Sequence, residues 1–383
     1  MIYFDNNATT SVAPEVLDAM LPFLGASFGN PSSSYSIGRQ NSAAIAGARR
    51  SVADLIGAAD AHEVVFTSCG SESDNWAIIG ALGANPGRRH IVTTRVEHEA
   101  VRNLCQKLET EGYSVTWLEV DTNGALDLDS LRSALTPSTA VVSVMHANNE
   151  TGVIFPVEHI AEIVKENSDA VFHVDGVTAV GKIAVDLKNS SMDLYSLSGH
   201  KLHGPKGIGA LYIRDGIDLP AFLTGGGQES GRRAGTEAVH QIAGLGAAAN
   251  FVKDLSAMAR VRELRDRLEN EILEKIQNSH LNGTPDSLNR LPNTSNISFE
   301  NTNGEAILAR LDDLGICVST GSACNSDSHT ASPVLAAMNV PYSRAMGSIR
   351  FSLGRFNTAA EVDEVLARLP DVIKDIRTLS GTP

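Results

Sequence analysis

Cysteine is scarce in this sequence: there are only four, and no two of them are spaced as C-x-x-C. Disulfide frameworks and zinc or iron–sulfur cages need paired or clustered cysteines, so this spacing argues against each of them. His200 and His203 form a possible metal pair, but no third ligand accompanies them. We therefore expect no metal site, and one of the four cysteines is available as a reagent.

The sequence also lacks a net positive charge, basic runs and long apolar runs. The formal net charge is −14 at pH 7, and no basic run offsets it. This balance disfavours nucleic acid or an anionic membrane as the main partner, and it leaves room for a basic protein partner. No apolar run approaches the roughly 20 residues that span a bilayer, and the N-terminus lacks the basic flank and apolar stretch of a signal peptide. These absences predict a globular, cytoplasmic protein.

Short β-rich runs alternate with helical or loop stretches in the first two thirds of the chain. Seven such runs occur, at residues 63–68, 90–95, 114–120, 139–147, 171–177, 194–200 and 208–214. Their succession predicts an α/β domain with a largely parallel sheet covered on both faces. Ligands of such sheets gather at the carboxyl ends of the strands.

The pattern changes near residue 256, where a charged amphipathic helix begins. Separated strands and helices then follow, at residues 294–300, 306–314, 348–354 and 359–379. This change predicts a second, smaller α+β domain. The expected organisation is an N-terminal segment that joins the small domain, a large domain and a small domain, with bounds at residues 1–14, 15–255 and 256–383.

Two expected strands end in residues that suit one cofactor. Lys201 lies at the end of the apolar strand expected at residues 194–200, beside Ser198 and His200, and precedes a glycine turn. A partly desolvated lysine loses its proton readily and forms a Schiff base with an aldehyde. Asp175 ends another apolar strand, and its carboxylate is the partner that a pyridinium nitrogen needs to stay protonated. A surface lysine is the ordinary alternative for Lys201 alone, but the two strand ends together predict a pyridoxal 5'-phosphate site.

Residues 67–72, with the sequence Thr-Ser-Cys-Gly-Ser-Glu, follow a strand and open a helix. Small residues such as Gly70 and Ser71 expose backbone N–H groups and hydroxyls to a phosphate at a helix N-terminus. An ordinary helix cap has the same composition. His98 also follows an expected strand; it is either a packed loop histidine or a ring that stacks on the pyridine face and moves protons.

Three polar residues further along the chain have two interpretations each. Asn148 and Asn149 follow an expected strand, and they either bind a substrate carboxylate or cap the next turn. Arg350 lies among apolar neighbours, where its guanidinium needs a carboxylate, either a structural partner or that of an amino-acid substrate.

The four cysteines separate by their surroundings. Cys105 and Cys317 have apolar neighbours, so we expect both in the core. Cys324 lies in a polar, turn-rich stretch, residues 320–330, in which a thiol is exposed as a nucleophile must be. Cys69, at the start of an expected helix, is the alternative site of a reactive thiol.

Six motifs make the chain similar to a known family. They are residues 28–33 (Phe-Gly-Asn-Pro-Ser-Ser), 67–72, 147–152 (Ala-Asn-Asn-Glu-Thr-Gly), 198–201 (Ser-Gly-His-Lys), 232–237 (Arg-Arg-Ala-Gly-Thr-Glu) and 321–324 (Gly-Ser-Ala-Cys). Together they resemble the cysteine desulfurases, fold-type-I pyridoxal phosphate-dependent transferases, and most closely the nitrogen-fixation, NifS-like branch. The resemblance covers residues 3–355. It implies a large domain with a seven-stranded, mostly parallel sheet and a smaller α+β domain that carries a catalytic cysteine loop.

The resemblance implies a role for each matching residue. Lys201 would bind the cofactor, Asp175 would pair with its ring nitrogen and His98 would stack on its face. The remaining cofactor contacts would come from Gly70, Ser71, Thr178, Ser198, His200 and, from the neighbouring subunit of a homodimer, Thr236. Asn149 and Arg350 would hold the substrate carboxylate, and Cys324 would receive sulfur.

The implied reaction converts L-cysteine to L-alanine and leaves a persulfide on Cys324. The sulfur would pass to a scaffold protein of the iron–sulfur assembly type. A selenocysteine lyase or a fold-type-I aminotransferase is an alternative that needs no loop cysteine. A catalytically idle binding subunit of the same fold is another, although the intact Lys201 and Cys324 oppose it.

Several positions depart from the family pattern, and they are the features that favour a binding subunit. Thr178 replaces a glutamine three residues after the ring aspartate, and Tyr35 and Met346 replace common histidines. Residues 331–334 read Ala-Ser-Pro-Val in place of Pro-Ser-His-Val. The chain stops at residue 383, without the C-terminal extension that housekeeping desulfurases use to grip their scaffold.

Overall fold

The computed structural model describes residues 1–320 and 331–379. Its largest element is a seven-stranded sheet, made of β2 (Val64–Thr67), β3 (His90–Thr94), β4 (Ser114–Leu118), β5 (Thr139–Met145), β6 (Val171–Asp175), β7 (Leu194–Ser198) and β8 (Gly209–Ile213). The strand order is β2-β8-β7-β6-β5-β3-β4. β8 runs antiparallel to both of its neighbours, and the other pairs are parallel. All seven expected strands and the mostly parallel α/β fold are confirmed.

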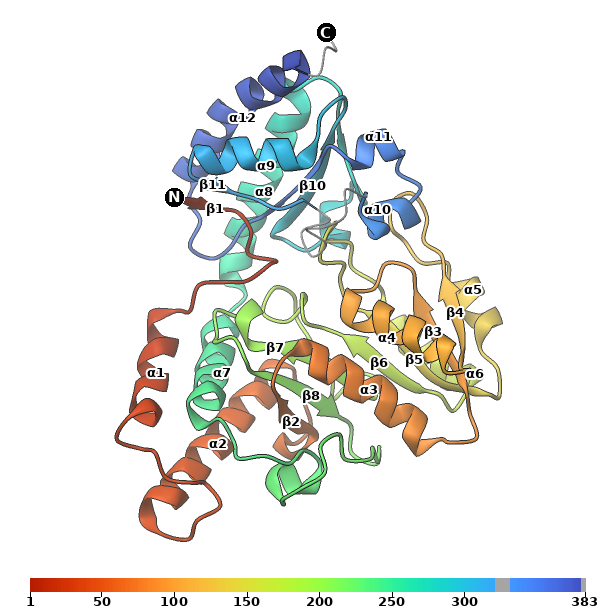
Figure 1. Ribbon diagram of the computed structural model, residues 1–383, viewed down its shortest axis with the longest axis vertical. Helices are drawn as coiled ribbons and strands as arrows, with labels where there is room; N and C mark the ends of the chain where they lie inside the picture. Colours follow the sequence, from red (N-terminus) through yellow and green to blue (C-terminus); the bar gives the residue numbers. More distant parts are fainter. Residues whose placement is uncertain (321–330, 380–383) are drawn as a thin grey trace.

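Helices cover the sheet because its central strands are apolar on both faces. Every residue of β5, β6 and β7 is buried, as expected for parallel strands packed between helical layers. The helices of this part are α3 (Gly70–Ala84), α4 (Glu99–Thr110), α5 (Leu128–Ala134) and α6 (Val157–Asn167). A further group, α1 (Pro14–Leu24), α2 (Ser36–Leu55) and α7 (Val239–Val252), packs together near β2 (Figure 1).

A second, smaller sheet lies in the upper half of Figure 1, where β12 (Ser348–Ser352), β10 (Thr294–Phe299) and β9 (Ser279–Leu281) pair antiparallel. The helices around it are α8 (Ser256–Lys275), α9 (Gly304–Asp313), α10 (Pro333–Ala337), α11 (Tyr342–Ala345) and α12 (Ala359–Leu379). The start of the chain belongs here, since β1 (Ile2–Tyr3) pairs with β11 (Ile316–Cys317) and Phe4 enters the core of this half. The exact domain bounds at residues 14 and 255 stay a prediction.

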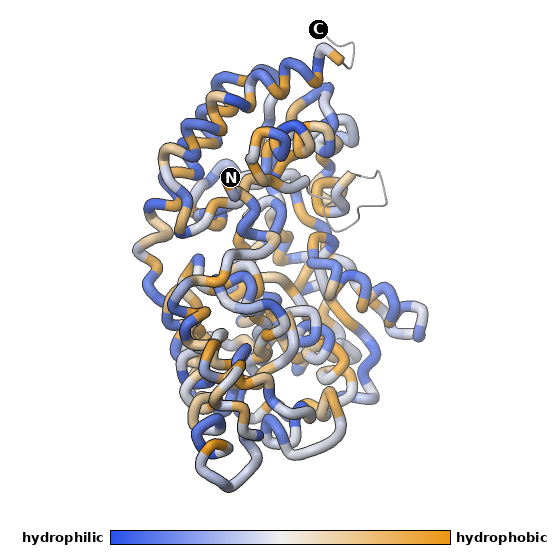
Figure 2. The backbone as a smooth tube through the Cα atoms, turned by 60° about the vertical axis from the view of Figure 1, so that its left-hand side comes forward, coloured by the Kyte–Doolittle hydropathy of each residue, from blue (hydrophilic) through white to orange (hydrophobic). Residues whose placement is uncertain are grey.

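The long helix α12 illustrates how the smaller half is built. Hydrophilic and hydrophobic residues alternate along it (Figure 2). Its buried side chains recur about once per turn, singly or as adjacent pairs: Val362, Val365, Leu366, Leu369, Val372, Ile373 and Ile376. This spacing places them on one face of the helix. No helix among the described residues is long and apolar enough to cross a membrane.

The turn after β6 requires glycine at residue 176. A Cβ atom there would lie 1.9 Å from Cε1 of Tyr195, whose buried ring is held by a 2.8 Å hydrogen bond between its hydroxyl and Nδ1 of His146. The tight approach of this turn to β7 fixes the backbone next to Asp175. Asp175 therefore leaves the sheet at a well-defined point.

Candidate functional site

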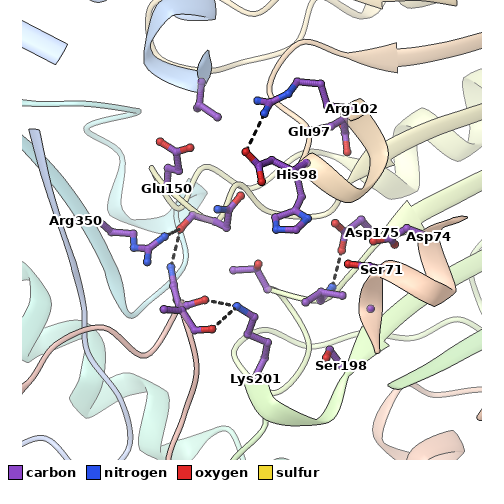
Figure 3. A pocket seen from close by; sticks show the side chains of 18 of the residues that line it. Ser71, Asp74, Glu97, His98, Arg102, Glu150, Asp175, Ser198, Lys201 and Arg350 are labelled. Carbon is purple, nitrogen blue, oxygen red and sulfur yellow. Dashed lines mark hydrogen bonds and ion pairs between the residues drawn. The ribbon is translucent and has the colours of Figure 1, made fainter. Parts of the chain in front are cut away.

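A cavity of about 410 Å³ lies at the carboxyl ends of the parallel strands, between the two hydrophobic cores. Ten predicted site residues line it: Gly70, Ser71, His98, Asn149, Asp175, Thr178, Ser198, His200, Lys201 and Arg350. Figure 3 shows the labelled side chains of several of them pointing into this space. Thr236 is exposed and does not line the cavity. Cys324 lies outside the described residues.

Lys201 ends a short 3-10 turn, Gly199–Lys201, that follows β7. Its Nζ donates hydrogen bonds to the carbonyl oxygens of Asn7 and Ala8, the latter at 2.9 Å (Figure 3). Both carbonyls come from the N-terminal segment, which sequence reasoning had not connected with the site. Two backbone carbonyls thus hold the amine at the cavity wall.

Asp175 and His98 lie together on another wall. Asp175 is buried, and its Oδ1 accepts a 2.9 Å hydrogen bond from the backbone N–H of Val177. Burial raises the pKa of Asp175, while His98, this hydrogen bond and Lys201 oppose that rise. His98 caps α4, because its Nδ1 accepts a 3.1 Å hydrogen bond from the N–H of Ala100. That bond assigns the ring proton to Nε2, and burial lowers the pKa of His98.

The start of α3 suits an anion. Gly70 is its first residue, and a Cβ there would lie 2.7 Å from Cγ2 of Val177, so only glycine fits. The hydroxyl of Ser198 also borders the cavity and is buried without a hydrogen-bond partner. A phosphate at the N–H groups of the helix would supply the missing acceptor. These residues therefore fit the phosphate end of pyridoxal phosphate.

His200 lies close to this anion site. Burial, followed by the nearby lysines, lowers its pKa to about 4, so its ring is neutral near pH 7. A neutral imidazole still offers one N–H donor.

Arg350, on β12, pairs with a carboxylate of the protein itself, which was one of the two interpretations of this residue. Its Nη2 lies 2.7 Å from Oδ1 of Asp5, and its Nη1 donates to the carbonyl oxygen of Asn149 at 3.1 Å. Its buried Nε has no partner. Asn148 adopts the capping role, since its Oδ1 accepts from the N–H groups of Glu150 and Thr151.

The cysteine expectations hold in part. Cys105 is buried, as predicted, and burial raises the pKa of its thiol to about 12. The expectation for Cys317 is wrong, because this residue is only half-buried on the two-residue strand β11. Cys69 is half-buried, precedes α3 and lines the cavity.

Sequence reasoning missed several charged residues of the cavity, which are Asp74, Glu97, Glu99, Arg102 and Glu150. Three of them could have been found from the sequence, because Glu97 and Glu99 flank His98 and Glu150 directly follows Asn149. Position next to a predicted site residue at a strand end was the available signal.

Glu150 generates a prediction about stability and pH. Its Oε2 accepts a 2.5 Å hydrogen bond from the hydroxyl of Ser332, and burial raises its pKa to about 7. The folded protein thus binds this proton more tightly than the unfolded chain does, so stability is lost as pH rises from about 4.5 to about 7. Glu150→Gln removes this loss and keeps an acceptor for Ser332. Between these two pH values, we expect the free energy of unfolding of the variant to rise relative to that of wild type by about 3 kcal/mol.

Urea unfolding at a series of pH values measures this gain. The exposed Glu166→Gln serves as the control and should show no such trend. A difference between Glu150→Gln and wild type that stays constant with pH would contradict the prediction.

The comparisons with known proteins agree with this geometry. The family described as aminotransferase class-V matches residues 2–365. A cysteine desulfurase of Nostoc sp. (strain PCC 7120) is 52% identical over 382 residues, which cover 99% of this chain and 94% of the relative. The solved structure of a NifS-like protein has a TM-score of 0.91 and 36% identity, and covers 98% of this chain and 99% of its own.

A third match is the solved structure described as SspA in complex with cysteine. It has a TM-score of 0.83 and 35% identity, and the match covers 94% of this chain and 100% of that one. The chain therefore belongs to the class-V aminotransferase family and, within it, to the cysteine desulfurases.

Proposed function

We propose that this protein is a pyridoxal phosphate-dependent cysteine desulfurase that converts L-cysteine to L-alanine and leaves a persulfide on Cys324. One observation carries the proposal: a single cavity brings Lys201, Asp175 and the N-terminus of α3 together with Arg350 from the other half of the molecule. The first three suit the aldehyde, ring nitrogen and phosphate of the cofactor. Arg350 suits the carboxylate of an amino acid.

The cofactor would be held from several sides. Lys201 would bind its aldehyde carbon, Asp175 its ring nitrogen and His98 its ring face. Gly70, Ser71, Ser198, His200 and Thr236 of a second copy would bind its phosphate, and Thr178 would lie near its phenolic oxygen. When bound, pyridoxal phosphate supplies an electron-accepting ring that stabilises negative charge at the substrate α-carbon.

The chain's own residues would then move protons and sulfur. Arg350 and Asn149 orient the substrate carboxylate, and the Lys201 amine, once released, takes the α-proton. The thiolate of Cys324 forms an S–S bond with the substrate sulfur as the substrate Cβ–S bond breaks. The electron pair of that bond stays with the carbon skeleton, which gains protons and leaves as alanine.

We also propose a cytoplasmic location and a sulfur-acceptor scaffold protein of the iron–sulfur assembly type as the partner. The net charge of −14 supports an acceptor with a basic docking face. A selenocysteine lyase or an aminotransferase would not need the thiol of Cys324, but the cysteine desulfurase relatives do not favour this alternative.

Lys201→Ala should abolish the covalent link to the cofactor and the yellow colour of the purified protein. The reason is that a methyl side chain cannot bind the aldehyde. Borohydride reduction of wild type, followed by peptide mapping, should label Lys201. Label on Lys206 or another lysine would show that the site is assigned to the wrong residue.

Cys324→Ser should bind pyridoxal phosphate and cysteine but lose release of sulfide and alanine by roughly 10³-fold, since serine lacks a thiolate. Cys69→Ser is the matched control, because Cys69 also borders the cavity; it should keep turnover with at most a modest loss of cofactor affinity. Sulfide and alanine assays under reductant measure both. If the phenotypes were exchanged, Cys69 would be the nucleophile, and if both variants stayed active, the lyase or aminotransferase alternative would replace the desulfurase.

We expect a homodimer in solution. Thr236 is exposed and does not line the cavity of its own chain, which suits a residue that binds the cofactor of a second copy. Leu17, Leu21 and Leu24 of α1 are also exposed, at one-turn spacing, and such apolar surface favours association. Light scattering should give twice the chain mass, and Thr236→Ala should weaken cofactor binding. A monomer with full activity would contradict both expectations.

A further inference from the structure

Three carboxyl groups share the wall of the cavity around Asp175. Asp74 comes from α3, Glu97 lies just after β3 and Asp175 ends β6, and all three are buried (Figure 3). Among residues 1–320 and 331–379, neither Asp74 nor Glu97 forms an ion pair with a lysine or arginine. Like charges in a low-dielectric site cannot all ionise.

The hydrogen bonds of Glu97 indicate where its proton resides. Its Oε1 accepts two hydrogen bonds, from the hydroxyl of Thr94 at 2.7 Å and from the N–H of Met145 at 3.1 Å. Its Oε2 is buried and has no partner. A bare carboxylate oxygen would be costly there, whereas a carboxylic acid places its O–H on the oxygen that accepts nothing.

Asp74 faces a neutral ring and a hydroxyl, and neither brings a positive charge. Its Oδ1 is buried without a hydrogen bond, and the nearest basic atom is Nε2 of His173 at 3.6 Å. The ring of His173 is engaged by the hydroxyls of Ser143 and Ser196, both at 2.9 Å. Burial lowers the pKa of His173 to about 3, so this ring brings no positive charge.

Asp175 differs from the other two carboxyls because Lys201, His98 and a backbone donor face it. Its Oδ1 accepts from the N–H of Val177, and both His98 and Lys201 lower its pKa. Burial raises the pKa of Glu97 to about 8. Burial and then the nearby Asp175 raise the pKa of Asp74 well above its usual range, and a hydrogen bond with Ser196 opposes that rise. Asp175 is therefore the carboxyl that ionises first.

We propose that Asp74 and Glu97 are positioning residues that stay protonated at neutral pH, so that Asp175 is the one carboxylate among these three groups. The consequence for the cofactor ring nitrogen rests on the proposed function, but the protonation pattern does not. A neutral acid beside Asp175 does not repel its charge, whereas a second carboxylate would raise its pKa and weaken its pairing with a pyridinium.

Infrared difference spectra of the full-length protein at neutral pH test the protonation directly. Asp74→Asn and Glu97→Gln should each remove a carbonyl band of a protonated carboxyl, and Asp175→Asn should remove only carboxylate bands. Glu63→Gln is the matched control, because Glu63 is buried but both of its oxygens accept hydrogen bonds, from Ala59, Asp60, Tyr212 and Asp215. Loss of a carboxylate band in Asp74→Asn or Glu97→Gln would overturn the proposal.

A second measurement covers the case in which a variant fails to fold by circular dichroism. In wild-type protein with ¹³C-labelled carboxyl carbons, nuclear magnetic resonance should find one aspartate that titrates above neutral pH and, besides Glu150 with its pKa of about 7, one glutamate that does so. A titration in which every carboxyl ionises below neutral pH would refute the proposed pattern.

The cofactor-loaded protein tests the consequence. Asp175→Asn should shift the pH midpoint of the visible absorbance by about one unit or more, and Glu97→Gln should shift it by a small fraction of that. Equal shifts would mean that Glu97 carries a charge, against the proposal. Absence of sulfide release with the infrared result intact would instead refute the desulfurase function and leave the protonation pattern standing.

Discussion

The cavity depends on the hydrogen bonds by which residues 5–10 join the two halves of the molecule. Nδ2 of Asn7 donates to the hydroxyl of Thr294 at 2.8 Å and to the carbonyl of Asn149 at 3.1 Å. The N–H and hydroxyl of Thr10 both donate to the carbonyl of His200. Such buried polar bonds fix a unique geometry, because each group left unpaired is costly. The smaller half, with β12, is thereby held against the turn that carries Lys201.

The same segment explains how charge is distributed in the cavity. Asp5 pairs with Arg350, and the carbonyls of Asn7 and Ala8 hold the Lys201 amine. Asp5 limits the positive charge of Arg350, and the two carbonyls hold the Lys201 amine without adding a negative charge of their own. The N-terminal segment thus places both cations at the cavity. This arrangement strengthens the binding of an anionic substrate or cofactor, because its attraction to each cation is larger in a low-dielectric site.

The sheet and the first site residues could be predicted because their signal is local. Seven apolar runs at regular intervals gave the strands, and Lys201 and Asp175 were identified as the residues where two of them end. The pairing of Arg350 with Asp5 could not be predicted, since 345 positions separate the two residues. The missing hydrogen bonds of Asp74 and Glu97 were equally hidden, because an unpartnered oxygen is a property of the packed site and has no signature in the chain.

Some of the positions that depart from the family pattern line the cavity, and others do not. Tyr35 is exposed and Met346 follows α11, and neither lines the cavity. Pro333 does line it, as the first residue of α10, where proline's fixed φ suits a helix start and the hydroxyl of Ser332 caps the turn. Thr178 is the departure nearest the expected cofactor, and its carbonyl oxygen accepts a 2.8 Å hydrogen bond from Nζ of Lys182. Of the three residues that favoured an idle binding subunit, Tyr35 and Met346 thus do not line the cavity. The third, Thr178, is held in place by a hydrogen bond of its backbone. Its short side chain therefore leaves the turn after Asp175 undisturbed.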